Sequence, residues 1–450
     1  MPYGPFPGVE LEFDLHANAV DDANHSLTLD AAVAPILNGI AAASATDLFV
    51  ISHGWNNDKQ EARDLYSAFF TTLQALVSAG TVTVPAARKM FVVAVLWPSA
   101  RFVDSSEIPG GAAAAIDPAI LVVQQQLRVL RAAFEGNPAA QASIDVALAA
   151  AANLDFDLNA ADAFVNALNA LPTTDDEEHD TITTAVSSAV EATQHGSSSA
   201  PSNVLTSLAT LPPPNAPSIA TGDDTGGATG IFDNIKAGAL SLASLFTYKT
   251  MKERAGVVGR AGLAPVLGKI RTAYPSLRIH LAGHSFGARL VTSAANKPWD
   301  GNDPTNQAVT LSLLQGAFSH FGFAVNFLSL GHNGAFRDVV GKPAVSGSIN
   351  ITHSVHDMAV GWAYPAASLV FGQVASGLAD ANPFGGMGAD GAVSTPEAIF
   401  DDLHEAGQPY TALPDRLRVR NLCGDHYISG HGDITGNEVV YAVLADVFST

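Results

Sequence analysis

One pentapeptide carries the strongest chemical signal in this 450-residue chain, Gly283-His284-Ser285-Phe286-Gly287. An apolar run predicted to be a strand, 277–282, precedes it, and a predicted amphipathic helix follows. A serine hydroxyl is a weak nucleophile until a base takes its proton. Small residues such as Gly283 and Gly287 allow a tight strand-to-helix turn that leaves the serine exposed. The context predicts Ser285 as a nucleophile, and the alternative is a glycine-rich turn without chemistry.

Acyl transfer by such a serine also needs two hydrogen-bond donors for the developing oxyanion. The backbone N–H of Phe286 is the natural first donor, because it follows the nucleophile. The second donor is expected from the loop after the predicted strand 47–52, where glycine lets the backbone approach a substrate closely. The N–H of Gly54 or of Trp55 is therefore a candidate, and His53 is predicted to support the loop. An ordinary turn is the alternative interpretation.

Three segments occur in the chain in this order: FVISHGWNN at 49–57, VLWPS at 95–99 and HLAGHSFG at 280–287. Together they resemble the bacterial α/β-hydrolases of the lipase and esterase kind, which carry HG[YW]NN, WPS and GHSxG patterns and whose specificity is unknown. The resemblance implies an α/β-hydrolase fold, with a mostly parallel central sheet and helices on both faces. It does not extend to the region 101–246.

The resemblance also implies a catalytic triad in the chain order serine, acid, histidine. Asp357 follows the predicted strand 348–352 and matches the acid, although it could instead cap the segment that follows. His431 lies in a His-Gly-Asp-Ile stretch just before the last helix and matches the family histidine, with His426 as the alternative base. The implied reaction is hydrolysis of a carboxylic ester through an acyl-enzyme on Ser285.

Other functions remain open at this stage. The same three residues could cleave amides, which would make the protein an amidase or peptidase, or the fold could serve as a non-catalytic binding protein. The histidines and carboxylates between 353 and 433 could also bind a metal ion. However, the sequence contains no HExxH motif, no cysteine cluster and no calcium-loop spacing. We therefore expect no metal and no organic cofactor.

The elements that must position these residues follow the pattern of an α/β protein, because short β-type runs alternate with helical stretches. The run 9–15 alternates apolar and acidic residues, as a half-buried edge strand does. The other predicted strands are 47–52, 91–96, 277–282, 309–314, 348–352 and 417–422, and the predicted helices of this part are 58–77, 249–274, 286–296 and 437–448.

The region 101–246 differs in character from the rest of the chain. It is rich in alanine, shows helical spacing in 120–134 and 144–171, and carries 17 acidic residues against 4 basic ones. A low-complexity segment, 196–230, is expected to have little order. We predict a discontinuous catalytic domain, 1–100 plus 247–450, with 101–246 as a mainly helical insertion that could act as a cap or lid.

The overall composition limits the partners. Hydrophobic residues make up 47% of the chain and charged residues 14%, which is typical of a globular protein. The net charge of −21 disfavours nucleic acid and anionic membrane surfaces as partners. We see no signal peptide and no apolar run of about 18 residues, so we expect a soluble, cytoplasmic protein without a membrane anchor, with export left open. The expected partner is a small ester or lipid substrate, and the oligomeric state is not predicted.

Overall fold

The structure is a computed structural model, and it describes residues 2–55, 57–99, 117–172, 202–209, 228–299, 307–326, 333–342, 344–360 and 385–449. These residues fall into two compact units. The α/β unit lies within Met1–Ser99, Lys252–Val360 and Gly385–Thr450, and the helical unit lies within Ala100–Met251. The second boundary therefore falls inside a helix, a few residues later than the predicted start of the resumed domain at 247.

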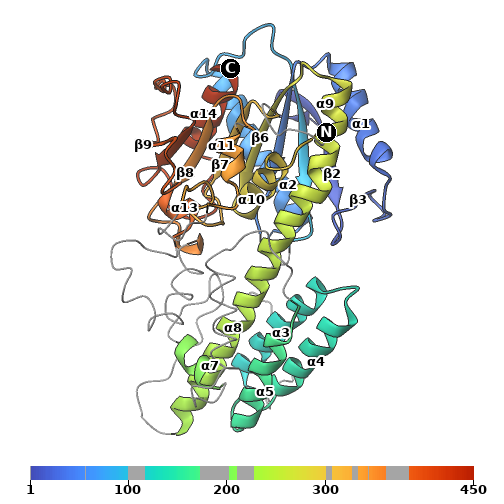
Figure 1. Ribbon diagram of the computed structural model, residues 1–450, viewed down its shortest axis with the longest axis vertical. Coiled ribbons are helices and arrows are strands. Elements are labelled where there is room, and N and C mark those ends of the chain that lie inside the picture. The colour runs from blue at the N-terminus through green and yellow to red at the C-terminus, as the bar shows by residue number, and fades with distance from the viewer. Residues whose placement is uncertain are drawn as a thin grey trace. The chain divides into compact units, whose positions relative to one another are not determined.

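One ten-stranded sheet forms the centre of the α/β unit (Figure 1), in the order β1-β2-β5-β4-β6-β7-β8-β10-β9, with β3 pairing with β2. The pairings from β2 to β9 are parallel, whereas β1 and β3 are antiparallel to β2. This confirms the predicted mostly parallel sheet. The strands are β1 (Pro2–Tyr3), β2 (Phe6–Phe13), β3 (Ala19–Val20), β4 (Asp47–Ser52), β5 (Met90–Leu96), β6 (Arg278–His284), β7 (Thr310–Leu314), β8 (Ile349–His353), β9 (Ala398–Asp402) and β10 (Val419–Cys423).

The prediction of an edge strand at 9–15 is correct in part. One side of β2 pairs with β5, and the other side pairs only at its two ends, with β1 at residues 6–7 and with β3 at residues 12–13. The acidic residues of β2 form ion pairs with a helix. Glu10 pairs with Arg63 at 2.8 Å, and Glu12 pairs with Lys59.

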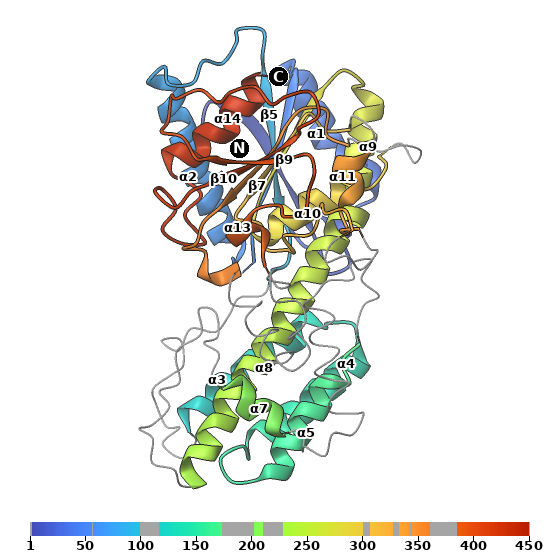
Figure 2. The ribbon, with the colours of Figure 1, turned by 60° about the vertical axis from the view of Figure 1, so that its left-hand side comes forward.

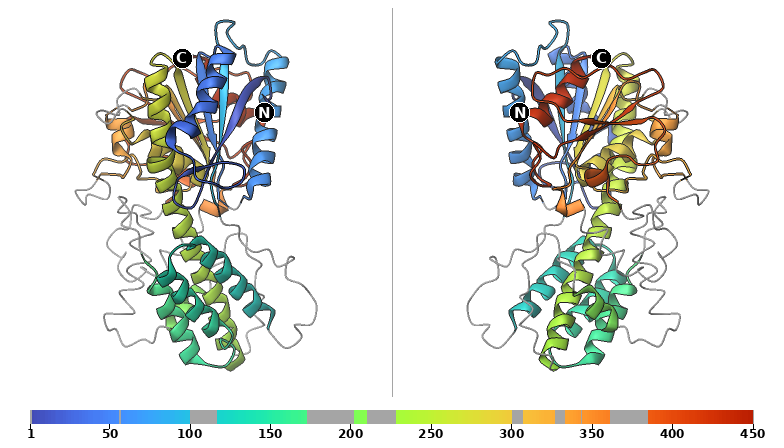
Figure 3. Two further views of the ribbon diagram at one scale, coloured as in Figure 1. Left: turned by 90° about the vertical axis from the view of Figure 1, so that its right-hand side faces the viewer. Right: turned by 90° about the vertical axis from the view of Figure 1, so that its left-hand side faces the viewer.

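Helices cover both faces of the sheet. Figure 2 shows α2 and α14 on one face and α1, α9 and α10 on the other, and Figure 3 shows the same layers from two further sides. The helices of this unit are α1 (Leu29–Ala43), α2 (Lys59–Ser78), the end of α8 (Ala228–Val257), the π-helix η2 (Val258–Leu263), α9 (Ala264–Ala273), α10 (Phe286–Ala295), α11 (Arg337–Gly341), α13 (Met387–Asp390) and α14 (Asn437–Ser449). Sequence analysis missed α1, whose apolar pattern is interrupted by Pro35.

One hydrophobic core lies between the sheet and the pair α2 and α14. Phe49 of β4 packs against Phe69 and Phe70 of α2, with ring centroids 6.4 and 6.1 Å away. The central strands β4 and β5 are buried along their whole length, as expected for parallel strands with helices on both faces. Because neighbouring strands run parallel, their carboxyl ends meet at one edge of the sheet, and the loops after β4, β6, β7, β8 and β10 all begin there.

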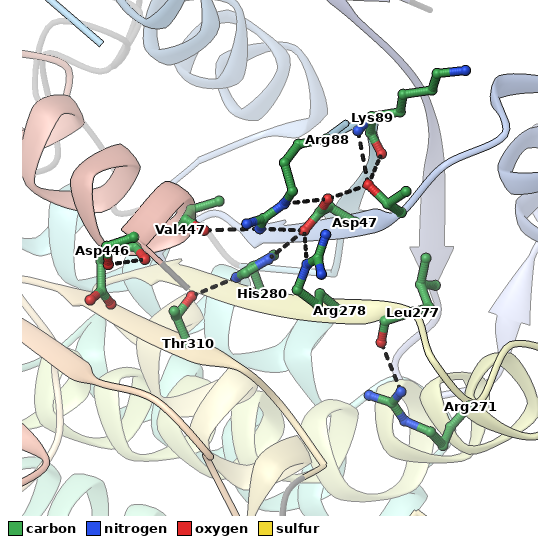
Figure 4. A network of polar contacts seen from close by, with 12 residues as sticks. Asp47, Arg88, Lys89, Arg271, Leu277, Arg278, His280, Thr310, Asp446 and Val447 are labelled. Carbon is green, nitrogen blue, oxygen red and sulfur yellow. Dashed lines mark hydrogen bonds and ion pairs between the residues drawn. The ribbon is translucent and has the colours of Figure 1, made fainter. Parts of the chain in front are cut away.

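At the opposite edge of the sheet, the amino ends of the strands hold a buried polar network (Figure 4), which we call the Asp47 network. Asp47, the first residue of β4, accepts hydrogen bonds from Arg88 at 2.6 Å and from Arg278 at 3.0 Å. His280 of β6 lies 3.1 Å from the Asp47 carboxylate through Nε2, and 2.9 Å from the Thr310 hydroxyl of β7 through Nδ1. The side chains of Asp47 and His280 are fully buried.

The helical unit contains α3 (Pro118–Ala133), α4 (Pro138–Ala151), α5 (Leu158–Asn169), α7 (Ser202–Leu208) and most of α8. The helical pattern at 144–171 is therefore two helices, and Asp157 caps the second by accepting a hydrogen bond from the N–H of Asn159. Of the low-complexity segment 196–230, α7 and the start of α8 are ordered helix, contrary to expectation, and the rest lies outside the described residues. No helix in the described part of the chain is both long and apolar enough to span a bilayer.

Candidate active site

The predicted nucleophile lies on a strained turn between β6 and α10. Ser285 has φ 57° and ψ −122°, a conformation that residues with a side chain rarely adopt. Neither flanking glycine leaves room for a side chain. A Cβ on Gly283 would lie 2.3 Å from the carbonyl oxygen of Gly287, and a Cβ on Gly287 would lie 2.3 Å from that of Ser52. The missing side chains let the helix pack directly on β6 and β4, which holds Ser285 at the carboxyl edge of the sheet.

The structure brings the three predicted residues Ser285, His431 and Asp357 into one chain of hydrogen bonds. His431 Nε2 lies 2.7 Å from Ser285 Oγ, and His431 Nδ1 lies 2.9 Å from each carboxylate oxygen of Asp357. The carboxylate accepts only, so Nδ1 carries the proton and Nε2 is free to accept the serine proton. The Asp357 side chain is fully buried, while that of His431 is 22% exposed.

Asp357 has two tasks at the end of β8. Its Oδ1 accepts a hydrogen bond from the N–H of Val360 at 3.0 Å, so the capping role considered from the sequence is present together with the contact to His431. A glycine that sequence analysis missed gives it room: a Cβ on Gly388 would lie 2.8 Å from Asp357 Oδ2. Gly388 is far from Asp357 in the sequence, and no local pattern marks it.

The backbone of the histidine loop is held by two side chains. His284 Nε2 donates to the carbonyl of His431 at 2.8 Å. Gln315 Nε2 donates to the same carbonyl at 2.8 Å and to that of Gly430 at 2.9 Å. Sequence analysis missed Gln315, which is fully buried and directly follows β7 with φ 46°. Its one available signal is that it is a polar residue at the carboxyl end of a buried strand.

His284 remains neutral in this setting. Burial, with a smaller contribution from the nearby His431, lowers the pKa of His284 to about 3. A neutral ring with its proton on Nε2 can donate to the carbonyl of His431 without adding a charge beside the predicted base. The alternative base, His426, is exposed and makes no hydrogen bond or ion pair with the described residues. The structure therefore places His431, and not His426, next to Ser285.

The predicted oxyanion loop lies beside the nucleophile. A Cβ on Gly54 would come within 2.7 Å of the Ser285 Cβ, so this loop packs directly against the elbow. The ring of Trp55 stacks on that of Phe286, with centroids 5.6 Å apart. The two stretches of backbone predicted to supply the oxyanion donors are thus neighbours in space.

His53 is locked into the same loop. Its Nδ1–H donates to the Gly54 carbonyl at 2.8 Å, and its Nε2 accepts from the N–H of Trp97 at 3.2 Å. The indole of Trp97 stacks on it at 5.6 Å. Burial lowers the pKa of His53 to about 4, so it is neutral near pH 7. With both ring nitrogens engaged, His53 fixes the loop and has no free position for proton transfer.

Among the described residues, no group of three or more histidine, cysteine or acidic side chains is arranged to hold a metal ion. Comparisons with protein-family models, with curated proteins and with solved structures gave no match to this chain. Its function must therefore be inferred from its own residues and their geometry.

Proposed function

We propose that this protein is a serine hydrolase with an α/β-hydrolase fold, and that it cleaves carboxylic esters through an acyl-enzyme. The observation that carries the proposal is the hydrogen-bond chain from Asp357 through His431 to Ser285, built on a strained elbow at the carboxyl edge of the sheet. The arrangement is that of a nucleophile, a general base and a group that orients the base.

In the proposed reaction, Ser285 Oγ attacks the ester carbonyl carbon while His431 Nε2 takes the hydroxyl proton. Asp357 keeps the imidazole in the productive tautomer and stabilises the imidazolium that forms. The tetrahedral intermediate then expels the alcohol, which takes the proton from His431. A water molecule attacks the acyl-enzyme with the same base, and the carboxylic acid leaves as Ser285 regains its proton.

The negative oxygen of each tetrahedral intermediate requires donors next to the serine. The backbone N–H of Phe286 and that of Gly54 or Trp55 are the proposed pair, supported by the contact of Gly54 with Ser285 and by the stacking of Trp55 on Phe286. His53 is buried and both of its ring nitrogens are hydrogen-bonded, so it would hold this loop in place when no substrate is bound.

Cleavage of amides by the same residues is the alternative reaction. The helical unit, which is inserted between Ser99 and Lys252 in the sequence, is our candidate for the part that selects the substrate.

The test of the proposed function is hydrolysis of p-nitrophenyl esters of increasing acyl length, compared with hydrolysis of the matched p-nitroanilides. We expect turnover of esters by the full chain and a fall in kcat/KM of about 10⁴-fold or more in Ser285→Ala. Ser67→Ala, which changes an exposed serine on α2, is the control and should retain full activity. Equal rates in the two variants would contradict the proposal.

A further inference from the structure

The loop that carries Asp357 lies directly beside the loop that carries His431. The first, which we call the acid loop, is 354–360 and follows β8, and the histidine loop is 424–434 and follows β10. Because β8 and β10 are parallel neighbours in the sheet, the two loops begin next to each other. A shift of either loop would change the distance between the acid and the base. The contacts between the loops therefore decide how well the two residues are aligned.

Two hydrogen bonds between neutral groups join this pair of loops. The N–H of Gly424 donates to the carbonyl of His353, the last residue of β8, at 2.8 Å. The hydroxyl of Ser354 donates to the carbonyl of Ile428 at 3.2 Å. Both bonds lie at the start of the acid loop, so they hold it where it leaves the sheet.

A third contact between the loops uses a carboxylate. Asp425 Oδ1 accepts a hydrogen bond from the N–H of Val355 at 2.9 Å. Burial acts to raise the pKa of Asp425, but hydrogen bonding, chiefly from the N–H of Val355, outweighs it and lowers the pKa, so the carboxylate is ionised near pH 7. A hydrogen bond to an ionised group is roughly twice as strong as one between neutral groups. We therefore expect this contact to be the strongest of the three.

A tight turn passes this restraint on to Asp357. The N–H of Asp357 donates to the carbonyl of Ser354 at 3.0 Å, and the N–H of His356 donates to the Ser354 hydroxyl oxygen at 3.1 Å. Val355 is the second residue of this four-residue turn, so the carboxylate that holds its N–H also fixes the turn that presents Asp357. Both oxygens of Asp357 lie 2.9 Å from Nδ1 of His431, an arrangement that a small movement of the turn would break.

We propose that Asp425 is a positioning residue of the candidate active site. By holding the N–H of Val355, it keeps the acid loop on the histidine loop and Asp357 in line with His431. Its effect on the reaction rests on the proposed function, because the alignment affects a rate only where His431 acts as the base. Misplacing an orienting group by about 1 Å can cost up to about 100-fold in rate.

The first test is steady-state ester hydrolysis by the full chain and three variants. Asp425→Ala removes the acceptor, and we expect kcat to fall by about 10- to 100-fold with KM within about twofold of the unmodified protein. Asp425→Asn removes the charge but keeps a carbonyl oxygen for the N–H of Val355, so it should retain most of the rate. Asp21→Ala is the control: Asp21 also accepts backbone N–H groups, on the loop after β3, and its loss should leave kcat unchanged.

Val355→Pro breaks the same hydrogen bond from the donor side and keeps the charge of Asp425. Proline is favoured at the second position of such a turn, and the Val355 side chain is exposed. We expect kcat to fall as far as in Asp425→Ala, and the double variant to be no slower than either single variant. Equal losses in Asp425→Ala and Asp425→Asn would assign the effect to charge and overturn the proposal, as would an unchanged kcat in Val355→Pro. Val355→Pro also decides the question if Asp425→Ala does not fold.

Proton NMR gives a second measurement that does not need turnover. The Nδ1 proton of His431 lies against the Asp357 carboxylate and should give a downfield signal that is absent from His431→Ala. We expect Asp425→Ala and Val355→Pro to shift or broaden this signal in an otherwise folded spectrum, and Asp21→Ala to leave it in place. An unmoved signal in the first two variants would overturn the inference. A lack of ester turnover by the unmodified protein would contradict the proposed function instead, and the NMR comparison would still decide the role of Asp425.

Discussion

Among the described residues, an aspartate, a histidine and a hydroxyl form a hydrogen-bond chain at two places, one at each edge of the sheet. At the carboxyl edge, Asp357, His431 and Ser285 are joined by contacts of 2.9 and 2.7 Å. At the amino edge, the Asp47 network joins Asp47 to His280 at 3.1 Å and His280 to Thr310 at 2.9 Å. The residue types and distances are similar, yet we propose chemistry for only one of them.

The differences lie in charge, exposure and backbone. Asp47 is also paired with Arg88 and Arg278, and its histidine is fully buried inside a strand. Asp357 has no arginine within ion-pair distance among the described residues, and His431 is partly exposed on a loop. Ser285 lies on a strained turn, whereas Thr310 is the first residue of a regular strand.

A hydrogen-bond chain is therefore not sufficient for catalysis. A nucleophile must be reachable, its base must be able to gain a proton, and donors must face the developing charge. The carboxyl edge comes closer to these conditions, because the His431 side chain is 22% exposed there, whereas the side chain of His280 is fully buried. Ser285 itself is buried at 4% exposure, and Thr310 is fully buried. The amino-edge chain instead holds the amino ends of β4, β6 and β7 together.

The largest expected effect comes from the base of the carboxyl-edge chain. His431→Ala should lower kcat/KM for a p-nitrophenyl ester by about 10⁴-fold or more, equivalent to about 5.5 kcal/mol of transition-state stabilisation. His426→Ala removes an exposed histidine from the same loop and should keep activity within a few fold. Steady-state kinetics of the two variants test the assignment of His431 as the base. An inactive His426→Ala variant together with an active His431→Ala variant would reverse this assignment.

The second largest expected effect is a loss of stability caused by a substitution in the Asp47 network. Asp47→Asn leaves Arg88 and Arg278 without their carboxylate and should lower the free energy of unfolding by about 3–5 kcal/mol. Activity per folded molecule should stay the same. Urea unfolding combined with active-site titration measures both, and a loss of activity without a loss of stability would mean that the two chains are not separate in function.

The same variant has a predictable pH dependence. Burial acts to raise the pKa of Asp47, but hydrogen bonds from His280, Arg88, Thr46 and Arg278 outweigh it and hold the pKa well below its usual value. The ionised carboxylate therefore stabilises the fold above the unfolded-state pKa near about 3.9, and this contribution is lost as the pH falls below that value. The stability difference between the unmodified protein and Asp47→Asn should be constant near neutrality and shrink in acid. A difference that grows on acidification would contradict the sign of the shift.

A smaller effect is expected from the residue that holds the histidine loop. Gln315→Leu removes both donors to the carbonyls of Gly430 and His431. We expect kcat to fall by about 10- to 100-fold with little change in KM, because ground-state contacts remain while the base is less well oriented. Gln315→Asn keeps the amide on a shorter side chain and should recover part of the rate. An equal loss in both variants, in step with a loss of stability, would indicate a purely structural role.

The smallest expected effect comes from removing the hydroxyl of Thr310, which has the place in the amino-edge chain that Ser285 has in the carboxyl-edge chain. Thr310→Val removes the hydroxyl of the amino-edge chain and should cost about 1 kcal/mol of stability, with esterase activity unchanged. Thermal unfolding and ester turnover of the same sample are the measurements. A rate loss in Thr310→Val comparable to that in Ser285→Ala would remove the distinction between the two edges.

The parts of this structure that follow from local pattern were predictable from the sequence. Buried strands such as β4 are continuous apolar runs, and in a parallel sheet their carboxyl ends meet, so polar residues after β6, β8 and β10 could be expected near one another. The resemblance to α/β-hydrolases supplied Asp357 and His431 as partners of Ser285, and the shared end of the parallel strands is consistent with that assignment.

Features that depend on strand order or on packing across the fold were not predictable. Gln315 and Gly388 matter only because β7 and α13 lie beside the histidine loop and Asp357, and neither position has a sequence signal of its own. The Asp47 network joins β4, β6 and β7 across more than 200 residues, which no local pattern encodes. The break between α4 and α5, at 152–157, contains Asn153, Asp155 and Asp157, which are residue types typical of caps and turns, so the sequence did carry a signal for it that was missed.

The most direct test of the proposed function is reaction with a fluorophosphonate, followed by mass-spectrometric mapping of the adduct. Only an activated serine reacts rapidly with this reagent. We predict one adduct per chain, on Ser285, with none on unfolded protein and none on Ser285→Ala. An adduct on any other serine, or labelling of Ser285→Ala at the rate of the unmodified protein, would contradict the assignment of Ser285 as the nucleophile.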